Sequence, residues 1–308
     1  MTSKTIQKLP RGIFAASLTP LKSNLSIDTE LMLEHCHSLL ENGCDGLVIF
    51  GTTGEANSFS VRERIDLLDA LLAGGLPPHK LLIGTGCCAF PDSVELTKHA
   101  VKNDAGGVLV LPPFYYKNIS DEGIFHAFDR LIQEIKDERL KVYLYHFPKM
   151  AVISFSQALI RRMVETFPGI IIGMKDSTGD FENMKSNHNT FSGFDVYAGT
   201  EQLLSDILQI DAAGCVSASL NLTSRLAARV KNAFPGEEAK VLQKKLNAIR
   251  KEFEKHPMIP ALKQMMARKT GHISWTNLRP PLVSLDEPES RALEEALDAL
   301  QFSNYCSF

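Results

Sequence analysis

Eight short apolar runs recur along the chain, and turn residues bound each of them. They are rich in β-branched or aromatic residues and lack the strict alternation of apolar and polar positions that marks a half-exposed strand. Continuous runs of this kind are typical of strands that are buried on both faces. The predicted strands are Ile13–Leu18, Gly46–Phe50, Leu81–Thr85, Val108–Leu111, Val142–His146, Ile170–Met174, Asp195–Ala198 and Cys215–Ala218.

Longer amphipathic segments separate these runs. The first follows Asp28, a good N-cap, and stops at Gly43, and the second begins with the capping box Ser60-x-x-Glu63. The helices predicted between strands are Thr29–Asn42, Ser60–Ala73, Asp92–Asn103, Asp121–Glu138, Ser156–Phe167, Asp180–His188 and Glu201–Ile210.

The alternation of eight strands with helices predicts an α/β protein, a closed (β/α)8 barrel of the TIM-barrel type. A doubly wound open sheet is the alternative. Eight near-regular units, and the lack of Gly-x-Gly-x-x-Gly after the first predicted strand, favour the barrel.

Past the eighth predicted strand only helix-forming runs remain. We expect residues 1–223 to form the barrel with the active site, and residues 224–308 to form a C-terminal helical region. A connector, Arg279-Pro280-Pro281-Leu282, precedes the last helix. The predicted helices of this region are Ser224–Phe234, Gly236–Lys255, Ile259–Lys269 and Glu289–Gln301.

Composition and charge narrow the function classes. The net charge is −3 and 22% of the residues are charged, so no basic field is available for nucleic acid. Met1–Arg11 lacks the apolar core of a secretory signal, and no run approaches the roughly 20 apolar residues of a membrane helix. Six scattered cysteines are interpreted as reduced thiols. We therefore expect a cytoplasmic protein that binds neither nucleic acid nor membranes.

In barrels of this type, ligand chemistry lies at the C-terminal ends of the strands. Lys175 directly follows the sixth predicted strand, so its amine is expected in the barrel mouth. Desolvation there disfavours the charged ammonium and makes the amine a nucleophile. The ordinary alternative is a lysine that pairs with Asp176 or extends to solvent.

Tyr145 lies near the mouth end of the fifth predicted strand, on the same side as Tyr143. A phenol at that place could relay protons to and from a substrate, although a structural tyrosine is an open alternative. His146 is expected on the opposite side, towards the helices.

The segment Gly51-Thr52-Thr53-Gly54-Glu55 follows the second predicted strand. Its glycines allow a tight turn, and its hydroxyls and N–H groups could hold a carboxylate. A simple turn is the alternative, and Glu55 is expected to cap or orient the loop.

A further segment, Pro112-Pro113-Phe114-Tyr115-Tyr116, follows the fourth predicted strand and could form a pocket wall, a subunit interface or a proton relay.

Metal chemistry is poorly supported, because no His-x-x-x-His or His-x-Glu cluster stands at a strand end. Serine-based catalysis has no Gly-x-Ser-x-Gly elbow.

Together these segments resemble the pyruvate-dependent class I aldolases, which include dihydrodipicolinate synthase, N-acetylneuraminate lyase and 2-keto-3-deoxygluconate aldolase. The similarity runs from about Gly12 to Leu285 and is most specific in the loop after the second strand, in Tyr145-x-x-Pro148 and in Gly173-x-Lys175-x-x-x-Gly179.

The resemblance implies a role for each site residue. Lys175 would form an imine with pyruvate or a related 2-keto acid, without a cofactor or a metal. Tyr145 would shuttle protons, linked through Thr52 to Tyr116 of a neighbouring subunit. The substrate would be bound by Thr53 and Gly51 at its carboxylate and by Gly199 and Val216 at the pocket floor. A homotetramer built from tight dimers is expected, because Tyr116 must cross between subunits.

One departure from the resemblance concerns the second substrate. Dihydrodipicolinate synthases usually carry an Arg two residues beyond the proline of the fifth strand, where Met150 stands here. The positions of that synthase's lysine-feedback site also differ, with Val61, Arg64 and Cys88. A thioether cannot replace a bidentate guanidinium.

The Arg279-Pro280-Pro281-Leu282 connector is more similar to the 2-keto-3-deoxy sugar acid aldolases. Ser177, Glu201 and Gln202 could bind hydroxyl groups of such a substrate. We therefore expect a lyase or aldolase for a hydroxylated 2-keto-3-deoxy acid. The alternatives are the synthase, a dehydratase or deaminase of the same family, and a barrel that binds a keto acid without catalysis.

Overall fold

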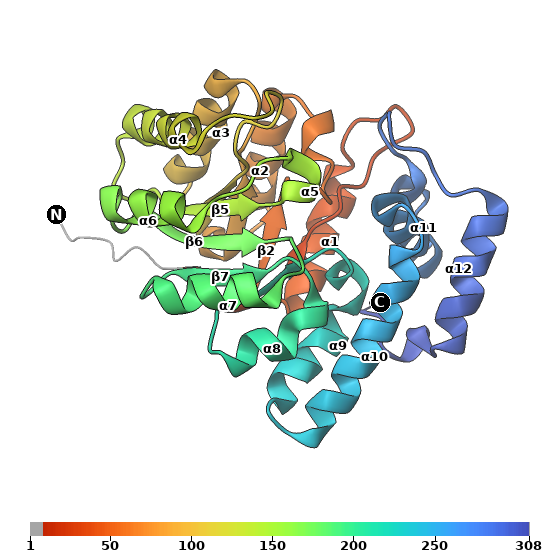
Figure 1. Ribbon diagram of the computed structural model, residues 1–308. Helices are drawn as coiled ribbons and strands as arrows, with labels where there is room; N and C mark the ends of the chain where they lie inside the picture. The colour runs from red at the N-terminus through yellow and green to blue at the C-terminus, as the bar shows by residue number, and fades with distance from the viewer. Residues whose placement is uncertain (1–8, 308) are drawn as a thin grey trace.

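The structure, a computed structural model, describes residues 9–307 and contains a closed barrel of eight parallel strands. The strands are β1 Gly12–Ala16, β2 Gly46–Ile49, β3 Leu81–Gly84, β4 Gly107–Val110, β5 Val142–His146, β6 Ile171–Asp176, β7 Asp195–Ala198 and β8 Gly214–Ser217. Neighbours in sequence are neighbours in the sheet, and β1 pairs with β8 to close it (Figure 1). The predicted TIM-barrel fold is confirmed.

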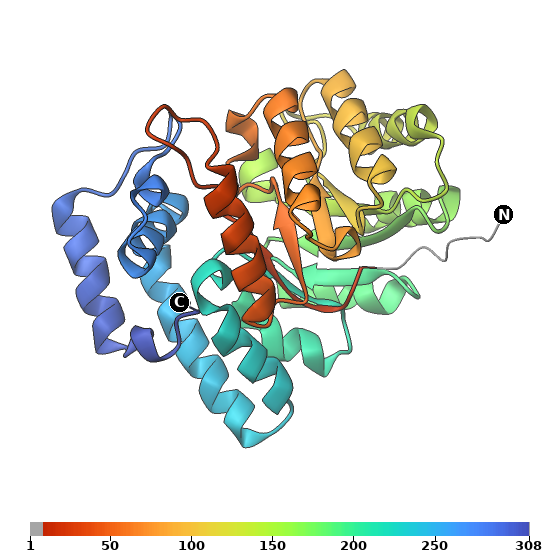
Figure 2. The same ribbon diagram turned by 180° about the vertical axis from the view of Figure 1, so that it is seen from behind.

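Helices cover the outside of the barrel between the strands (Figures 1 and 2). They are α1 Thr29–Glu41, α2 Val61–Ala73, α3 Phe90–Lys102, α4 Asp121–Ile135, α6 Gln157–Thr166, α7 Phe181–Thr190, α8 Leu204–Gln209 and α9 Leu220–Ala233. The capping box predicted at Ser60 and Glu63 is present, with each side chain bonded to the other residue's backbone N–H.

Most elements begin or end a few residues from the predicted positions, and three differences from the sequence prediction bear on the site. Strand β6 continues through Lys175 and Asp176, because their backbones still pair with β5 and β7 although their side chains are polar. The predicted helix Glu201–Ile210 divides into a short 3-10 turn, η3 Glu201–Leu203, and α8. One short helix, α5 Pro148–Ala151, was not predicted.

Side chains fill the barrel interior in place of a channel. Phe14 and Tyr143 both contact Tyr197 edge to face, with ring centroids 5.5 and 5.9 Å apart. Burial raises the pKa of Tyr143, so this layer stays neutral and closes the barrel below its mouth. A second apolar layer lies between the strands and the helices, and it holds most of the buried residues.

The helices α10 Glu237–Glu254, α11 Met258–Thr270 and α12 Glu287–Ala299 follow the barrel and lie on one side of it, next to α9 and α1 (Figures 1 and 2). The short 3-10 turns η1 Ala56–Ser58, η2 Pro78–Lys80, η4 Ile273–Thr276 and η5 Phe302–Asn304 complete the described elements. The predicted division between residues 223 and 224 falls inside α9, where Thr223 departs from helical geometry. That division stays a prediction.

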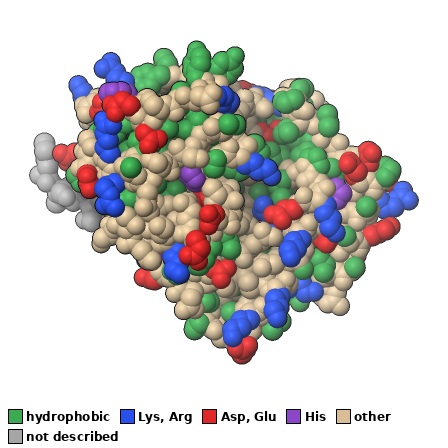
Figure 3. Space-filling view, viewed as in Figure 1, with side chains coloured by type: hydrophobic (Ala, Val, Ile, Leu, Met, Phe, Trp, Pro, Cys, Tyr) green, Lys and Arg blue, Asp and Glu red, His purple; other side chains and the backbone are tan. Residues whose placement is uncertain are grey.

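No helix within residues 9–307 is long and apolar enough to cross a membrane. Basic and acidic side chains are interspersed over the face shown in Figure 3. Residues 1–8, which hold most of the segment tested for a secretory signal, lie outside the described part of the chain.

The docking of α10 can be tested at Phe253, which is fully buried and packs edge to face against Phe302 of η5. Truncating a buried Phe removes its transfer free energy and leaves a cavity. We expect Phe253→Ala to lower the free energy of unfolding by about 3–5 kcal/mol in a urea titration. Val241→Ala on the same helix, at a side chain that is 67% exposed, serves as the control and should change it little. Equal effects of the two substitutions would contradict this packing.

Candidate active site

Lys175 lies inside the barrel mouth. Lys175 pairs on β6 with Tyr145 of β5 and with Tyr197 of β7, and only 5% of its surface is exposed. The amine Nζ donates a hydrogen bond to the Tyr145 hydroxyl at 3.2 Å and lies 4.5 Å from the centre of that ring. The site therefore contains a buried amine whose close polar neighbour is a phenol.

The Tyr145 hydroxyl has a second partner on the opposite side. Thr52 Oγ1, in the loop after β2, lies 3.3 Å from it. A pocket opens beside this pair, and its lining includes Gly51, Thr52, Gly84, Leu109 and Tyr145. Three hydrogen-bonding groups from β5, β6 and the β2 loop thus meet at the carboxyl ends of the strands.

Asp176 does not pair with Lys175. Its carboxylate accepts hydrogen bonds from Thr178 N at 2.9 Å, from Thr178 Oγ1 at 2.6 Å and from Asn183 Nδ2 at 2.6 Å. Alternation along β6 sends Asp176 towards the helices while Lys175 points inward. His146 also lies on the helix side, where its Nδ1 accepts from the backbone N–H of Phe155 at 3.2 Å. Burial lowers the pKa of His146.

The loop Gly51-Thr52-Thr53-Gly54-Glu55 is held from below by a buried ion pair. Glu55 Oε1 accepts from Lys263 Nζ of α11 at 2.7 Å, and both side chains are almost fully buried. Lys263 also donates to the Thr19 carbonyl at 2.9 Å, and Thr19 Oγ1 donates to the Gly54 carbonyl at 2.9 Å. Burial lowers the pKa of Lys263, and the facing carboxylate opposes that shift.

Arg279 is a second anchor of the same loop. Its backbone N–H donates to Glu55 Oε2 at 3.3 Å, and its guanidinium donates to the carbonyls of Leu25 and Ser58 and to Glu63. The hydrogen bond from Arg279 is the largest cause that lowers the pKa of Glu63 to about 2. The connector residue noted in the sequence therefore joins the C-terminal region to the β2 loop.

The strand ends on the other side of Lys175 are packed closely. Gly199 N donates to the Asp176 carbonyl at 2.6 Å, and Ser177 N donates to the His146 carbonyl at 2.8 Å. A Cβ at Gly199 would collide with the Ser177 side chain and the Asp176 backbone, so only glycine fits there. Val216 is fully buried in the barrel interior.

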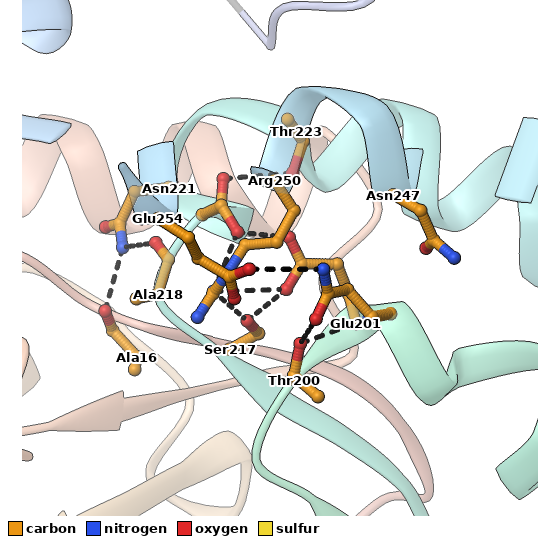
Figure 4. Close-up of polar contacts among 12 residues, drawn as sticks. Ala16, Thr200, Glu201, Ser217, Ala218, Asn221, Thr223, Asn247, Arg250 and Glu254 are labelled. Carbon is orange, nitrogen blue, oxygen red and sulfur yellow. Dashed lines mark hydrogen bonds and ion pairs between the residues drawn. The ribbon is translucent and has the colours of Figure 1, made fainter. Parts of the chain in front are cut away.

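Glu201 follows Gly199 closely in the chain, but its carboxylate accepts hydrogen bonds from other side chains of the protein. It is fully buried and accepts from the hydroxyls of Ser217 and Ser219 and from Arg250 Nη1 at 3.4 Å (Figure 4). Arg250 of α10 also donates to both serines, at 3.0 and 3.1 Å. This cluster joins the loops after β7 and β8 to α10, a connection that spacing along the sequence did not indicate.

Two other predicted positions lie at the surface. Tyr116 and Tyr115 are 72% and 73% exposed, and their rings contact each other edge to face. Met150, on α5, is 56% exposed. Within one chain Tyr116 makes no hydrogen bond to Thr52 or Tyr145, so the structure brings together Lys175, Tyr145 and Thr52 but not Tyr116.

Across residues 9–307 no three His, Cys, Asp or Glu side chains are grouped so that they could hold a metal ion. A parallel barrel with a buried lysine, a phenol and a threonine at its mouth is suited to chemistry in which an amine acts as the nucleophile.

The comparisons with known proteins agree with this class. The profile of the dihydrodipicolinate synthetase family matches residues 9–300, and the chain belongs to this family. It is 32% identical over 295 residues to an uncharacterized DapA-like lyase of Chloroflexus aurantiacus, covering 94% of this chain and 97% of that one.

Solved structures show the same fold. The crystal structure of dihydrodipicolinate synthase from Agrobacterium tumefaciens is 30% identical, with a TM-score of 0.85 and coverage of 94% of this chain and 99% of that one. A variant of the Sulfolobus solfataricus 2-keto-3-deoxygluconate aldolase has a TM-score of 0.86 at 22% identity, covering 96% and 97% of the two chains. The protein is therefore an enzyme, a lyase of a family whose members depend on pyruvate and form a Schiff base without a metal.

The Glu55–Lys263 pair offers a test of how the β2 loop is supported. Removing one partner leaves a buried charge unpaired, which typically costs about 3–5 kcal/mol. We expect Glu55→Gln and Lys263→Met each to lower the free energy of unfolding by about that amount. The double variant should cost clearly less than the sum, because it leaves neither charge. Additive losses in urea titrations would show that the two side chains act independently.

Proposed function

We propose that Lys175 forms an imine with the keto group of pyruvate or of a related 2-keto acid. The observation that carries this proposal is the buried Lys175 Nζ, bonded at 3.2 Å to a tyrosine hydroxyl that in turn lies 3.3 Å from Thr52. A lysine that served only packing or surface charge would not need a proton-transfer partner at its amine. The membership of the family supports the same chemistry.

The proposed reaction begins when the neutral amine attacks the C2 carbonyl to give a carbinolamine. Loss of water then gives an iminium ion, which accepts electrons from the C3–H or the C3–C4 bond. Tyr145 is placed to donate and accept the protons of these steps, and Thr52 to orient its hydroxyl. A positioned proton donor of this kind typically contributes ~10²–10⁴-fold to the rate.

The carboxylate of the keto acid is proposed to bind the loop after β2. Gly51 and Thr53 lie in this loop, and Thr53 is 8% exposed. Backbone N–H groups and hydroxyls of a tight loop are suitable carboxylate ligands. Gly199 and Val216 are proposed to form the floor, since Gly199 directly follows β7, the strand next to Lys175, and Val216 lies buried on β8, the next strand along.

For the second substrate we propose a hydroxylated 2-keto-3-deoxy acid. Met150 stands where the synthases are expected to carry an arginine, and it offers no charge to an aldehyde carboxylate. Ser177, partly exposed next to Gly199, is a suitable hydroxyl ligand. The buried Glu201 already accepts three hydrogen bonds from the protein, so its role as a substrate ligand is the less supported of the two.

The synthase reaction remains the second candidate, and the Agrobacterium structure at 30% identity favours it. A family dehydratase or deaminase would use the same imine. A keto-acid-binding barrel without catalysis has no specific support, because the amine, phenol and threonine are all in place.

We also propose that the enzyme is a homotetramer of tight dimers, in which Tyr116 reaches the site of a neighbouring subunit. Its exposed ring, beside the equally exposed Tyr115, is available for such a contact. Light scattering should give a tetrameric mass. A fully active monomer would exclude this role for Tyr116.

Imine formation is tested by reduction with sodium borohydride in the presence of pyruvate. We expect the intact mass to rise by one reduced pyruvate, and peptide mass spectrometry to place the adduct on Lys175. Lys175→Ala should abolish both the adduct and turnover. Lys149→Ala, at an exposed lysine of α5, should keep both. Trapping that persists in Lys175→Ala would overturn the proposal.

The second substrate is tested by measuring pyruvate release from a panel of 2-keto-3-deoxy acids and condensation of pyruvate with aldehydes. We expect the wild type to prefer hydroxylated substrates that lack a second carboxylate. Met150→Arg should raise kcat/KM for a carboxylated aldehyde about tenfold or more, because the guanidinium binds carboxylate in a bidentate manner. Met150→Lys adds the same positive charge without the planar guanidinium, so it serves as the control and should give a smaller gain. A wild type that already prefers the carboxylated aldehyde would favour the synthase.

A further inference from the structure

The segment that follows β3 separates two cavities. Gly84 and Gly86 line the pocket beside Tyr145, and Cys87 and Cys88 line a second cavity that reaches towards α3 and α4. Leu111 lines both cavities, and its backbone lies directly against Gly86. A change at Cys87 is therefore one residue away from the wall of the active-site pocket.

Arg64 of α2 approaches this segment from within the protein. Its Nη1 donates to Cys87 Sγ at 3.2 Å, and its Nη2 donates to the Gly84 carbonyl at 2.5 Å. Only 4% of Arg64 is exposed, and its Nε has no hydrogen-bond partner. In the part of the chain that the structure describes, no carboxylate lies within 4.0 Å of this guanidinium.

A buried guanidinium without a counter-charge is costly to the fold. The Cys87 sulfur is the one group in hydrogen-bond contact with Arg64 that can become an anion. Arg64 Nη1 points at the Cys87 sulfur, so the guanidinium is placed to stabilise the negative charge that develops there as the sulfur attacks an electrophile. The guanidinium is bonded to the sulfur from within the protein, and the same residue, Cys87, lines the cavity on its other side.

We propose that Cys87 is a covalent modification site for small α,β-unsaturated carbonyl compounds, which occupy the cavity next to it. The remaining lining is largely apolar, with Phe90, Leu111 and Phe128, and suits a small uncharged electrophile. In the reaction the sulfur gives its proton to water and bonds to the β-carbon, and the alkene electron pair moves towards the α-carbon, which takes a proton from water. The product is a thioether that retains all atoms of both reactants, so no oxidant is required.

The chain supplies its own matched control. Cys88 is adjacent and more exposed, but Arg64 donates to Cys87. Cys36, Cys44, Cys215 and Cys306 are buried. Burial raises the pKa of both Cys36 and Cys44 to about 12 and raises that of Cys215 well above its usual value, so these thiols react slowly.

N-ethylmaleimide at limiting concentration serves as the probe, with the adduct followed by intact mass. Cys88→Ser, which retains Cys87, should react about tenfold or more faster than Cys87→Ser, which retains Cys88. Arg64→Met should remove this difference by slowing the reaction of Cys88→Ser while leaving that of Cys87→Ser unchanged. A faster reaction at the more exposed Cys88 would overturn the proposal, because exposure alone would then control reactivity.

Arg64→Lys guards against a folding defect in Arg64→Met. It keeps the positive charge, so Cys87 should still react faster than Cys88, and a loss of selectivity in this folded variant would contradict the role of the charge.

The effect on turnover rests on the proposed function. One equivalent of adduct at Cys87 should lower kcat/KM, and full labelling without any change in turnover would refute the coupling to the active-site pocket. Labelling is measured by mass, so its outcome is independent of whether unlabelled protein traps pyruvate on Lys175.

Discussion

The Tyr145 hydroxyl lies between Lys175 Nζ and Thr52 Oγ1, and the arrangement of the barrel mouth depends on keeping it there. The two hydrogen bonds, of 3.2 and 3.3 Å, join groups from β5, β6 and the loop after β2. The position of the hydroxyl therefore depends on three separate strand ends. Because Tyr145 and Lys175 pair in register on β5 and β6, the sheet itself fixes the first contact. The second contact requires the loop after β2 to hold its shape.

That loop is supported by residues that lie far from it in sequence. Lys263 of α11 pairs with Glu55 across 208 residues, and Arg279 binds the same carboxylate through its backbone N–H. On the other side of the mouth, Arg250 of α10 holds the loops after β7 and β8 through Glu201 and two serines. The C-terminal helices therefore support the site as well as covering one side of the barrel. A substitution in α10 or α11 is expected to shift the loops that surround Lys175.

The sequence was sufficient to place site residues whose orientation follows from their position along one strand. Alternation along a strand places Tyr145 inside and His146 outside, and a strand end places Lys175 in the mouth. The continuation of β6 through Lys175 was missed because hydropathy falls at the lysine while backbone pairing does not. The partners of Glu55 and Glu201 could not be predicted either. Helical periodicity shows that Lys263 and Arg250 lie on helices but not which barrel loop each helix reaches.

The central claim is that Lys175, Tyr145 and Thr52 act as one unit in forming the imine. The most direct test is a double-mutant cycle on the rate of imine formation with pyruvate, using Tyr145→Phe and Thr52→Val. If Thr52 acts through the phenol, Tyr145→Phe should slow the step by ~10²-fold or more, and adding Thr52→Val should slow it little further. Fully additive losses, or a Tyr145→Phe variant with the rate of the wild type, would contradict the account.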